Sequence, residues 1–220
     1  MKKYIFIFCF SCVFPFSWAQ NTERNPAQPI NIESFIGNRG LMMNVNFSKP
    51  IAPNSRFGLF SLGEYYGTYK TRDQAAENQY MAQTHLTFAL LENFSVTGGF
   101  ILNQVDGLRP TMGLQYALKE KDFLFFINPR ADLTQTHNLE LMGFIEYNPK
   151  LQNNWGIYSR VQGLYNRDAQ HGFHAFSYLR MRLGMSYKVY RFGIAGNLTT
   201  MGPEKIHDNQ IGLFAGMLFF

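Results

Sequence analysis

Charged side chains recur at alternate positions in the second half of the chain, where the positions between them are apolar. Within residues 123–199 these are Arg130, Asp132, Glu140, Glu146, Arg160, Arg180, Arg182 and Arg191. Successive side chains of a β-strand point to opposite faces, so each charged position shares one face of its strand. Enclosed together, opposite charges stabilise one another, and five arginines against three carboxylates leave a mildly cationic set. Such a set either stiffens a structure or selects small solutes by charge.

The histidines offer weaker candidates for chemistry. His137, His171, His174 and His207 fall between predicted strands, with Asp168 and Glu204 near them in the sequence. His171 and His174 could present two imidazoles to a transition metal, but no third ligand stands at a fixed spacing. We therefore expect neither a resident metal nor a cofactor.

Catalytic motifs give no stronger signal. His85 and Ser95 are candidates for a base and a nucleophile, but the sequence holds no G-x-S-x-G, no H-E-x-x-H and no phosphate-binding loop. His85 stands alone among polar residues and is interpreted as a hydrogen-bonded interior group. The sequence does not predict an enzyme.

Strands must position these residues, since no window after residue 20 shows a sustained helical period. Segments of strand length are separated by turn residues such as Asp106-Gly107, Asn148-Pro149 and Gly202-Pro203. We predict twelve strands, at 31–36, 40–48, 57–70, 79–90, 94–103, 109–118, 123–133, 138–147, 155–165, 175–187, 190–199 and 208–220, with ten as the alternative count. The alternation in 57–70 is broken, which suggests a bulge near Gly63. The spacing predicts an all-β, antiparallel, up-and-down barrel.

The direction of the apolar face decides between a soluble and a membrane barrel. In 175–187, Leu179, Met181 and Leu183 oppose Arg180 and Arg182. About eight strands already give an interior that side chains fill, so twelve leave one too wide for Leu, Ile and Phe to pack. We therefore expect the apolar face outside, against lipid, with an aqueous charged interior. Tyr and Trp near the strand ends agree with interfacial aromatic belts.

The N-terminal residues have the features of an export signal. Lys2 and Lys3 precede an uncharged apolar run, and Ser17-Trp18-Ala19 suits cleavage before Gln20. The apolar run is shorter than the roughly 20 residues that a spanning helix requires. We predict a signal peptide at 1–19, a short polar segment at 20–30 and a barrel at 31–220.

Removing that peptide would change the composition of the chain. Cys9 and Cys12 would leave with it, so disulfides and thiol catalysis are not expected. Of 20 basic residues, the loss of two leaves 18 against 15 acidic residues, a formal charge of +3. The arginines are scattered singly, which does not favour nucleic acid as a partner.

The C-terminal segment ends on an apolar strand with Phe220 as its last residue. An uncapped apolar strand at a chain end invites aggregation in a soluble protein. The segment 208–220 resembles the closing strand of outer-membrane β-barrel proteins of Gram-negative bacteria. That resemblance implies a location in the cell outer membrane and an insertion signal, read by the barrel-insertion machinery, at Phe214, Leu218 and Phe220. No subfamily is indicated.

Bacterial barrels have an even number of strands, with short periplasmic turns and longer outer loops. Counting back from a periplasmic C-terminus places Lys188-Val189 and Glu92-Asn93 at the periplasmic side. Met201–His207, Asn166–His174 and Thr71–Asn78 then lie at the outer side. The long periplasmic connection Asn148–Asn154 and the short outer connection Thr134–His137 are exceptions to the rule.

These features favour a membrane barrel with a charged interior, acting as a narrow channel for small solutes or as a structural barrel in contact with outer-membrane lipid. The alternatives are an outer-membrane enzyme acting on lipid, and a soluble secreted β-barrel or sandwich that binds a ligand. If Arg180 and Arg182 line a pore, reversing their charge lowers its preference for anions.

Overall fold

The computed structural model describes residues 29–69, 78–134 and 137–220. The predicted signal peptide, nearly all of the polar segment at 20–30 and most of the predicted loop Thr71–Asn78 lie outside the described residues. In the part that the structure describes, no helix is long and apolar enough to cross a membrane.

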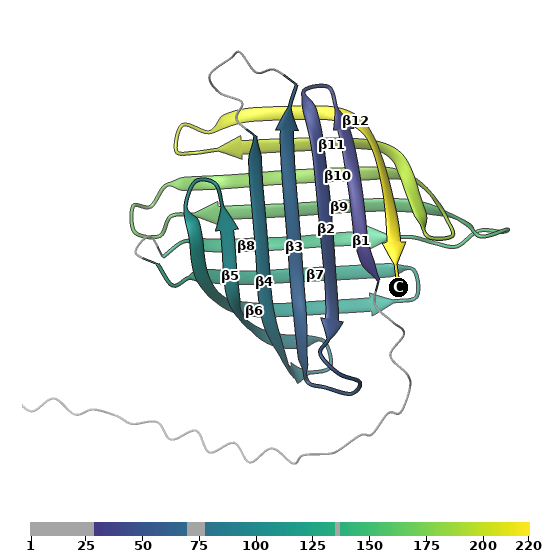
Figure 1. Ribbon diagram of the computed structural model, residues 1–220, viewed down its shortest axis with the longest axis horizontal. Helices are drawn as coiled ribbons and strands as arrows, with labels where there is room; N and C mark the ends of the chain where they lie inside the picture. Colours follow the sequence, from purple (N-terminus) through teal and green to yellow (C-terminus); the bar gives the residue numbers. More distant parts are fainter. Residues whose placement is uncertain (1–28, 70–77, 135–136) are drawn as a thin grey trace, which may run out of the picture.

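The described residues form twelve strands that close into an antiparallel barrel (Figure 1). Each strand pairs with its sequence neighbours, and β1 closes the barrel against β12, with Ile30 opposite Phe219 and Gly37 opposite Gly212. The strands are β1 Ile30–Gly37, β2 Gly40–Pro50, β3 Phe57–Thr68, β4 Gln79–Leu91, β5 Phe94–Asn103, β6 Gly107–Glu120, β7 Phe123–Asp132, β8 Leu139–Tyr147, β9 Trp155–Arg167, β10 His174–Tyr187, β11 Tyr190–Met201 and β12 Ile206–Phe219. The predicted class and the count of twelve are confirmed, and the alternative count of ten is wrong.

Turn residues end the strands where the sequence predicts it. Gly107, the first residue of β6, and Gly202, in the turn before β12, have positive φ values of 68° and 69°. An L-residue with a side chain rarely adopts this conformation, so glycine is suited to both positions.

The predicted bulge near Gly63 is wrong. Strand β3 pairs without a register shift with β2 on one side and with β4 on the other. Its alternation is hidden in the sequence because Phe60 and Leu62, which point inward, are apolar. Register shifts occur instead between Ala89 and Leu91, in the pairing of β4 with β5, and between His174 and Phe176, in the pairing of β10 with β9.

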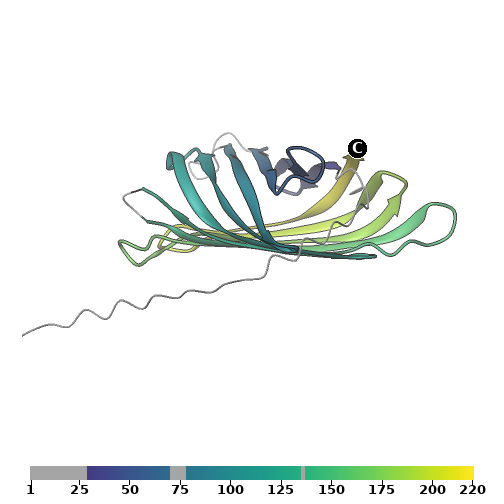
Figure 2. The ribbon, with the colours of Figure 1, turned by 90° about the horizontal axis from the view of Figure 1, so that it is seen from below.

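The barrel is flattened, and its two walls face each other at short range. Figure 1 shows β2–β5 of the near wall crossing β7–β10 of the far wall at a steep angle, and Figure 2 shows the flattening edge-on. Side chains therefore meet across the interior. The rings of Phe60 on β3 and Phe126 on β7 stack with their centroids 5.3 Å apart, although these strands are not neighbours.

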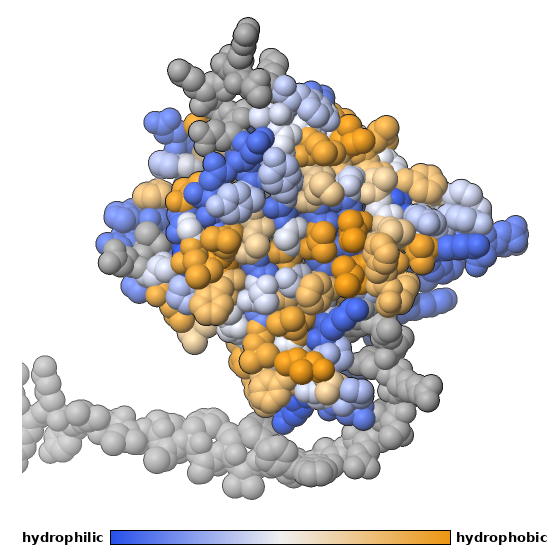
Figure 3. Space-filling model, viewed as in Figure 1, coloured by the Kyte–Doolittle hydropathy of each residue, from blue (hydrophilic) through white to orange (hydrophobic). Residues whose placement is uncertain are grey.

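The outer surface is apolar, as predicted. Leu179, Met181 and Leu183 on β10 are 40%, 41% and 56% exposed, while Arg182 between them is 5% exposed. Figure 3 shows hydrophobic residues over the middle of the face formed mainly by β1–β6 and hydrophilic ones toward its left and right edges. The soluble alternative requires the apolar side chains of β10 to point inward, so the structure disagrees with it.

Candidate functional site

All eight charged residues that the sequence singles out point into the barrel. Six of them are buried, namely Arg130, Asp132, Glu140, Glu146, Arg160 and Arg182. The side chains of Arg180 and Arg191 retain 13% and 11% exposure. The period-two pattern of five strands, β7 to β11, is what brings them to one interior.

Two of the ion pairs join adjacent strands, and a third joins β11 to β8, three positions apart in the barrel. Arg130 on β7 pairs with Glu140 on the adjacent β8, at opposite positions of the ladder. Arg191 Nη2 on β11 lies 2.7 Å from Glu146 Oε1 on β8. The other adjacent pair links Asp132 to Arg109 on β6. Pairs of opposite charge on neighbouring strands stabilise a sheet, so Arg130–Glu140 and Arg109–Asp132 strengthen the pairing of β7 with β8 and with β6.

Two further ion pairs cross the interior. Arg180 on β10 pairs with Glu64 on β3, and Arg182 Nε on β10 lies 2.7 Å from Glu33 Oε1 on β1. Strand β10 is adjacent to neither β1 nor β3, so both pairs connect strands that the backbone ladder does not join.

Arg109, Glu33 and Glu64 are interior charges that the sequence analysis missed. Glu64 stands in β3, where apolar inward residues hide the alternation, and Glu33 stands in the short first strand. Arg109 is the first residue of the segment predicted at 109–118, and a single charged residue there does not establish an alternation of polar and apolar positions. The five predicted arginines outnumber the three predicted carboxylates. Looking for further carboxylates at inward-facing strand positions to balance this excess of positive charge would have found Glu33 and Glu64.

Arg160 differs from the other interior arginines. Among the described residues, no carboxylate oxygen lies within the 4.0 Å that defines an ion pair with it. Its Nη2 donates to Gln162 Oε1 at 2.7 Å, and its guanidinium lies 4.5 Å from the ring centroid of Phe144. With the three additional residues, the interior set holds six arginines and five carboxylates, and Arg109 also lies 3.4 Å from the exposed Asp106. Arg160 is the arginine of this set without an ion pair among the described residues.

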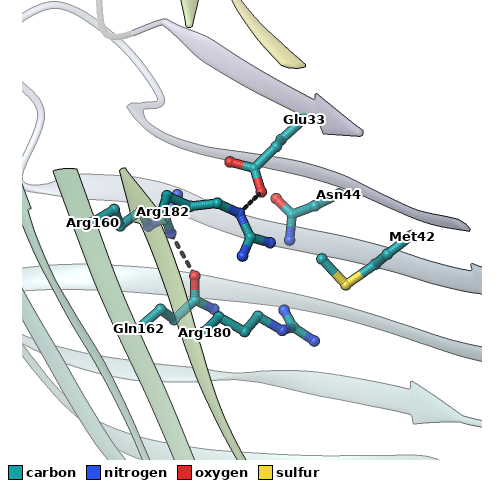
Figure 4. Close-up of a pocket in the computed structure, with 7 residues that line it drawn as sticks. All are labelled: Glu33, Met42, Asn44, Arg160, Gln162, Arg180 and Arg182. Atoms are coloured by element: carbon teal, nitrogen blue, oxygen red, sulfur yellow. Dashed lines mark hydrogen bonds and ion pairs between the residues drawn. The ribbon is translucent and has the colours of Figure 1, made fainter. Parts of the chain in front are cut away.

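A small cavity lies beside Arg160 in the interior. Its lining includes the three arginines Arg160, Arg180 and Arg182 together with Glu33 and Gln162, and Figure 4 shows these side chains converging from opposite walls. Its volume is about 10 Å³, room for about one water molecule. The interior is narrow at this level.

Two apolar clusters lie in the interior beside the buried charged and polar residues. One comprises Phe60, Leu62, Phe126, Met142, Leu164 and Tyr178, and the other Phe35, Met42, Tyr158, Ala195 and Phe214. The expectation that a twelve-stranded interior is too wide for apolar side chains to pack is wrong, because the flattening brings the walls close enough. The interior is therefore a mixture of packed aromatic groups and ion pairs, not a wide aqueous space.

The predicted metal candidates do not converge. His171 Nδ1 lies 2.8 Å from Asp168 Oδ2, while His174 places Nδ1 at 3.0 Å from the Gly202 carbonyl and Nε2 at 3.0 Å from Ser177 Oγ. Within 29–69, 78–134 and 137–220 no group of three or more His, Cys, Asp or Glu side chains has metal-binding geometry.

His85 and Ser95 do not meet either. His85 is 1% exposed, its Nε2 lies 2.8 Å from Thr111 Oγ1, and it stands opposite Gly99 in the ladder. Ser95 is four residues further along β5, about 13 Å at strand spacing. The geometry gives the histidine no serine nucleophile at this place.

The residues named for the insertion signal divide between two environments. Phe214 is 3% exposed and packs against Tyr158 in the interior, whereas Phe220 follows the end of β12 and is 74% exposed. The outward positions of β12 are the odd-numbered ones, including Ile211, Leu213 and Phe219.

Solved structures of membrane barrels resemble this architecture. A structure of the NanC porin has a TM-score of 0.50, with 12% identity over 88% of this chain and 100% of that one. The chain has the fold of an outer-membrane β-barrel. The KdgM porin is similar over 87% of this chain and 98% of that one, with 14% identity and a TM-score of 0.48. OmpT, an outer membrane protein of Vibrio cholerae, has a TM-score of 0.38 with 9% identity over 87% of this chain and 96% of that one.

No protein-family model and no curated protein matches the sequence. At these identities the similarity to solved structures concerns the fold alone.

Proposed function

We propose that the protein is a narrow outer-membrane channel for small solutes with a preference for anions. The observation that carries this proposal is the enclosed set of six arginines and five carboxylates, in which Arg160 stands opposite Glu146 in the ladder but has no carboxylate oxygen within 4.0 Å among the described residues. Charged groups that line a narrow passage select by sign and width. The apolar outer surface supports a position of the barrel within a membrane.

The proposal includes a location and partners. Residues 1–19 direct export, and the outward apolar residues contact outer-membrane lipid. The C-terminal strand is the part that the barrel-insertion machinery binds. Because β12 closes the barrel against β1, recognition of this strand leads directly to closure.

A structural barrel without conductance is the second candidate. It is favoured by the cavity at the ion pairs, which holds only about one water molecule. We do not propose an enzyme acting on lipid, since His85 is hydrogen-bonded to Thr111 and lies far from Ser95.

Planar-bilayer conductance of the purified, folded protein tests the proposal. We expect small discrete current steps, and a reversal potential in a salt gradient that indicates preference for anions. Arg160→Gln should reduce this preference, since it removes an interior cation and leaves no carboxylate unpaired. Replacing Arg180 or Arg182 with an acidic residue is a less direct test, because the new carboxylate would also lie beside Glu64 or Glu33.

Arg56→Gln is the matched control, because Arg56 is exposed outside the strands and hydrogen-bonds to the carbonyls of Ala89 and Leu90. It should leave the reversal potential unchanged. A folded protein without any current steps would support the structural barrel instead. Conductance with equal anion preference in the wild type and Arg160→Gln would remove Arg160 from the passage.

A further inference from the structure

The interior ion pairs differ in the distance that they span around the barrel. Arg130–Glu140 and Arg109–Asp132 join adjacent strands. By contrast, the order of strands places β3 five positions from β10 and β1 three positions from β10, and it also places β8 three positions from β11 in the Arg191–Glu146 pair. Arg180–Glu64 and Arg182–Glu33 connect β10 of the far wall with β3 and β1 of the near wall (Figure 1), whereas β8 and β11 both lie on the far side.

The Arg180–Glu64 pair has two hydrogen bonds and a supporting amide. Both guanidinium Nη atoms donate to the carboxylate, with Nη2–Oε2 at 2.8 Å. Asn44 Nδ2 on β2 donates to Glu64 Oε1 at 2.8 Å. A bidentate pair fixes direction as well as distance, so this contact holds β10 at a defined position across from β3.

The Arg182–Glu33 pair is also anchored at both sides. Arg182 donates through Nε to Glu33 and through Nη1 to Asn197 Oδ1, at 2.7 Å and 2.8 Å. Both residues of the pair are less than a tenth exposed. Figure 4 shows Glu33 and Arg182 approaching from opposite sides of the cavity.

These two pairs pack against both apolar clusters. The Arg180 guanidinium lies 3.8 Å from the ring centroid of Tyr178, a member of the first cluster. The Arg182 guanidinium lies 5.2 Å from that of Phe35 in the second cluster. The pairs thus fill the polar space that the aromatic side chains leave, and only about one water fits beside them.

We propose that Glu33 and Glu64 form a clasp with Arg182 and Arg180 that closes the passage, so that these two carboxylates set how readily solutes pass. This inference rests on the proposed channel function. Removing one member of a buried ion pair leaves an uncompensated charge, which is stable only when water reaches it. Loss of the clasp carboxylates therefore draws water between the walls and widens the polar part of the interior.

The first test measures access of water-soluble reagents to the cavity. The sequence has no cysteine after Cys12, so Met42→Cys places a single thiol in the barrel, at the edge of the cavity. In the folded protein in lipid vesicles, we expect slow modification by a charged methanethiosulfonate reagent. Adding Glu33→Gln and Glu64→Gln should accelerate it about tenfold or more, because hydration of the freed arginines opens the site.

Glu140→Gln is the matched control. It removes an equally buried carboxylate from an ion pair with Arg130, but that pair joins adjacent strands and does not cross the interior. It should leave the modification rate of the introduced thiol close to that of the parent Met42→Cys variant. Equal rates in the clasp variant and in this control overturn the proposal.

Folding is checked by heat-modifiable gel mobility, which distinguishes closed barrels from unfolded chain. If the double glutamine variant does not fold, Glu33→Gln combined with Arg182→Gln replaces it. This combination removes one crossing pair without leaving a buried charge, and we expect it to accelerate modification severalfold. An unchanged rate in that variant also overturns the clasp.

Conductance separates the clasp from the channel. Current steps that grow severalfold in the clasp variant support both proposals. Faster thiol modification without current in the wild type or the variant retains the clasp and contradicts the channel. Current in the wild type with an unchanged rate of modification in the variant retains the channel and overturns the clasp.

Discussion

Asp168 stabilises the loop between β9 and β10 by hydrogen bonds. Its Oδ1 accepts the backbone N–H of His171 at 2.8 Å, and Gly172 N donates to its carbonyl at 3.0 Å. These contacts form a compact turn at the end of β9. The same backbone N–H of His171 is the main cause that lowers the pKa of the Asp168 carboxyl below its ordinary value of 3.8, and the imidazole of His171 adds to it.

This lowered pKa predicts an acid-sensitive turn. The folded turn binds the proton less readily than the unfolded chain, so the carboxylate stabilises the turn above pH 3.8, and this stabilisation is lost as the pH falls through the lower folded value. Protection of the His171 amide from hydrogen exchange should be lower at pH 2 than at pH 6. The amide of Gly202, which donates to the Ala175 carbonyl, is the control. Equal protection of His171 at both pH values would contradict the assignment.

The inward or outward direction of a side chain was predictable where polar and apolar residues alternate regularly along its strand. Arg160 and Gln162 alternate with Ile157, Val161 and Tyr165 on β9, and parity alone places them inside. Parity says nothing about which carboxylate a guanidinium meets across the barrel. The partners of Arg180 and Arg182 follow from the spacing of the two walls, a property of the closed barrel and not of either strand.

At the scale of elements, β10 shows how one strand separates two environments. Its outward residues Leu179, Met181 and Leu183 are substantially exposed, and its inward residues Tyr178 and Arg182 are buried. Strand length, turn residues and the period of two all agree here, which is why the ends of the predicted strands differ from the observed ones by no more than two residues.

A charge on the outward face of β10 should be costly. Met181 stands near the middle of the strand, so Met181→Arg is expected to reduce the free energy of unfolding by about 2–4 kcal/mol, the range for a basic residue at the bilayer midplane. Leu108→Arg, at the exposed start of β6, should cost about 0–1 kcal/mol, as near the membrane interface. Urea unfolding in lipid vesicles measures both. Similar losses at the two positions would argue against a lipid-facing β10.

Strand β3 shows the limit of pattern analysis. Its inward face carries Phe60 and Leu62 beside Glu64, so hydrophobicity alternates poorly although the ladder is regular. A sequence period reports the contrast between two faces, and it fails where both faces are apolar. The packing of Phe60 on Phe126 depends on the opposite wall and is not encoded in the strand itself.

The interior of the barrel is narrow because the barrel is flattened. Twelve strands are compatible with a wide barrel. Here two aromatic clusters and the ion pairs Arg180–Glu64 and Arg182–Glu33 connect the walls. The count of strands was predictable from the sequence, but the cross-section was not, because many weak contacts between distant segments determine it.

The central claim is that apolar side chains point toward lipid while charged ones point into the barrel. The most direct test is carbene labelling of the wild-type protein in vesicles, with a diazirine probe dissolved in the hydrocarbon and mass spectrometry at residue resolution. Label should alternate along β10, appearing on Leu179, Met181 and Leu183 and sparing Arg180 and Arg182. Label on the arginines in place of the leucines, or an unlabelled barrel left in the aqueous phase, would contradict the account.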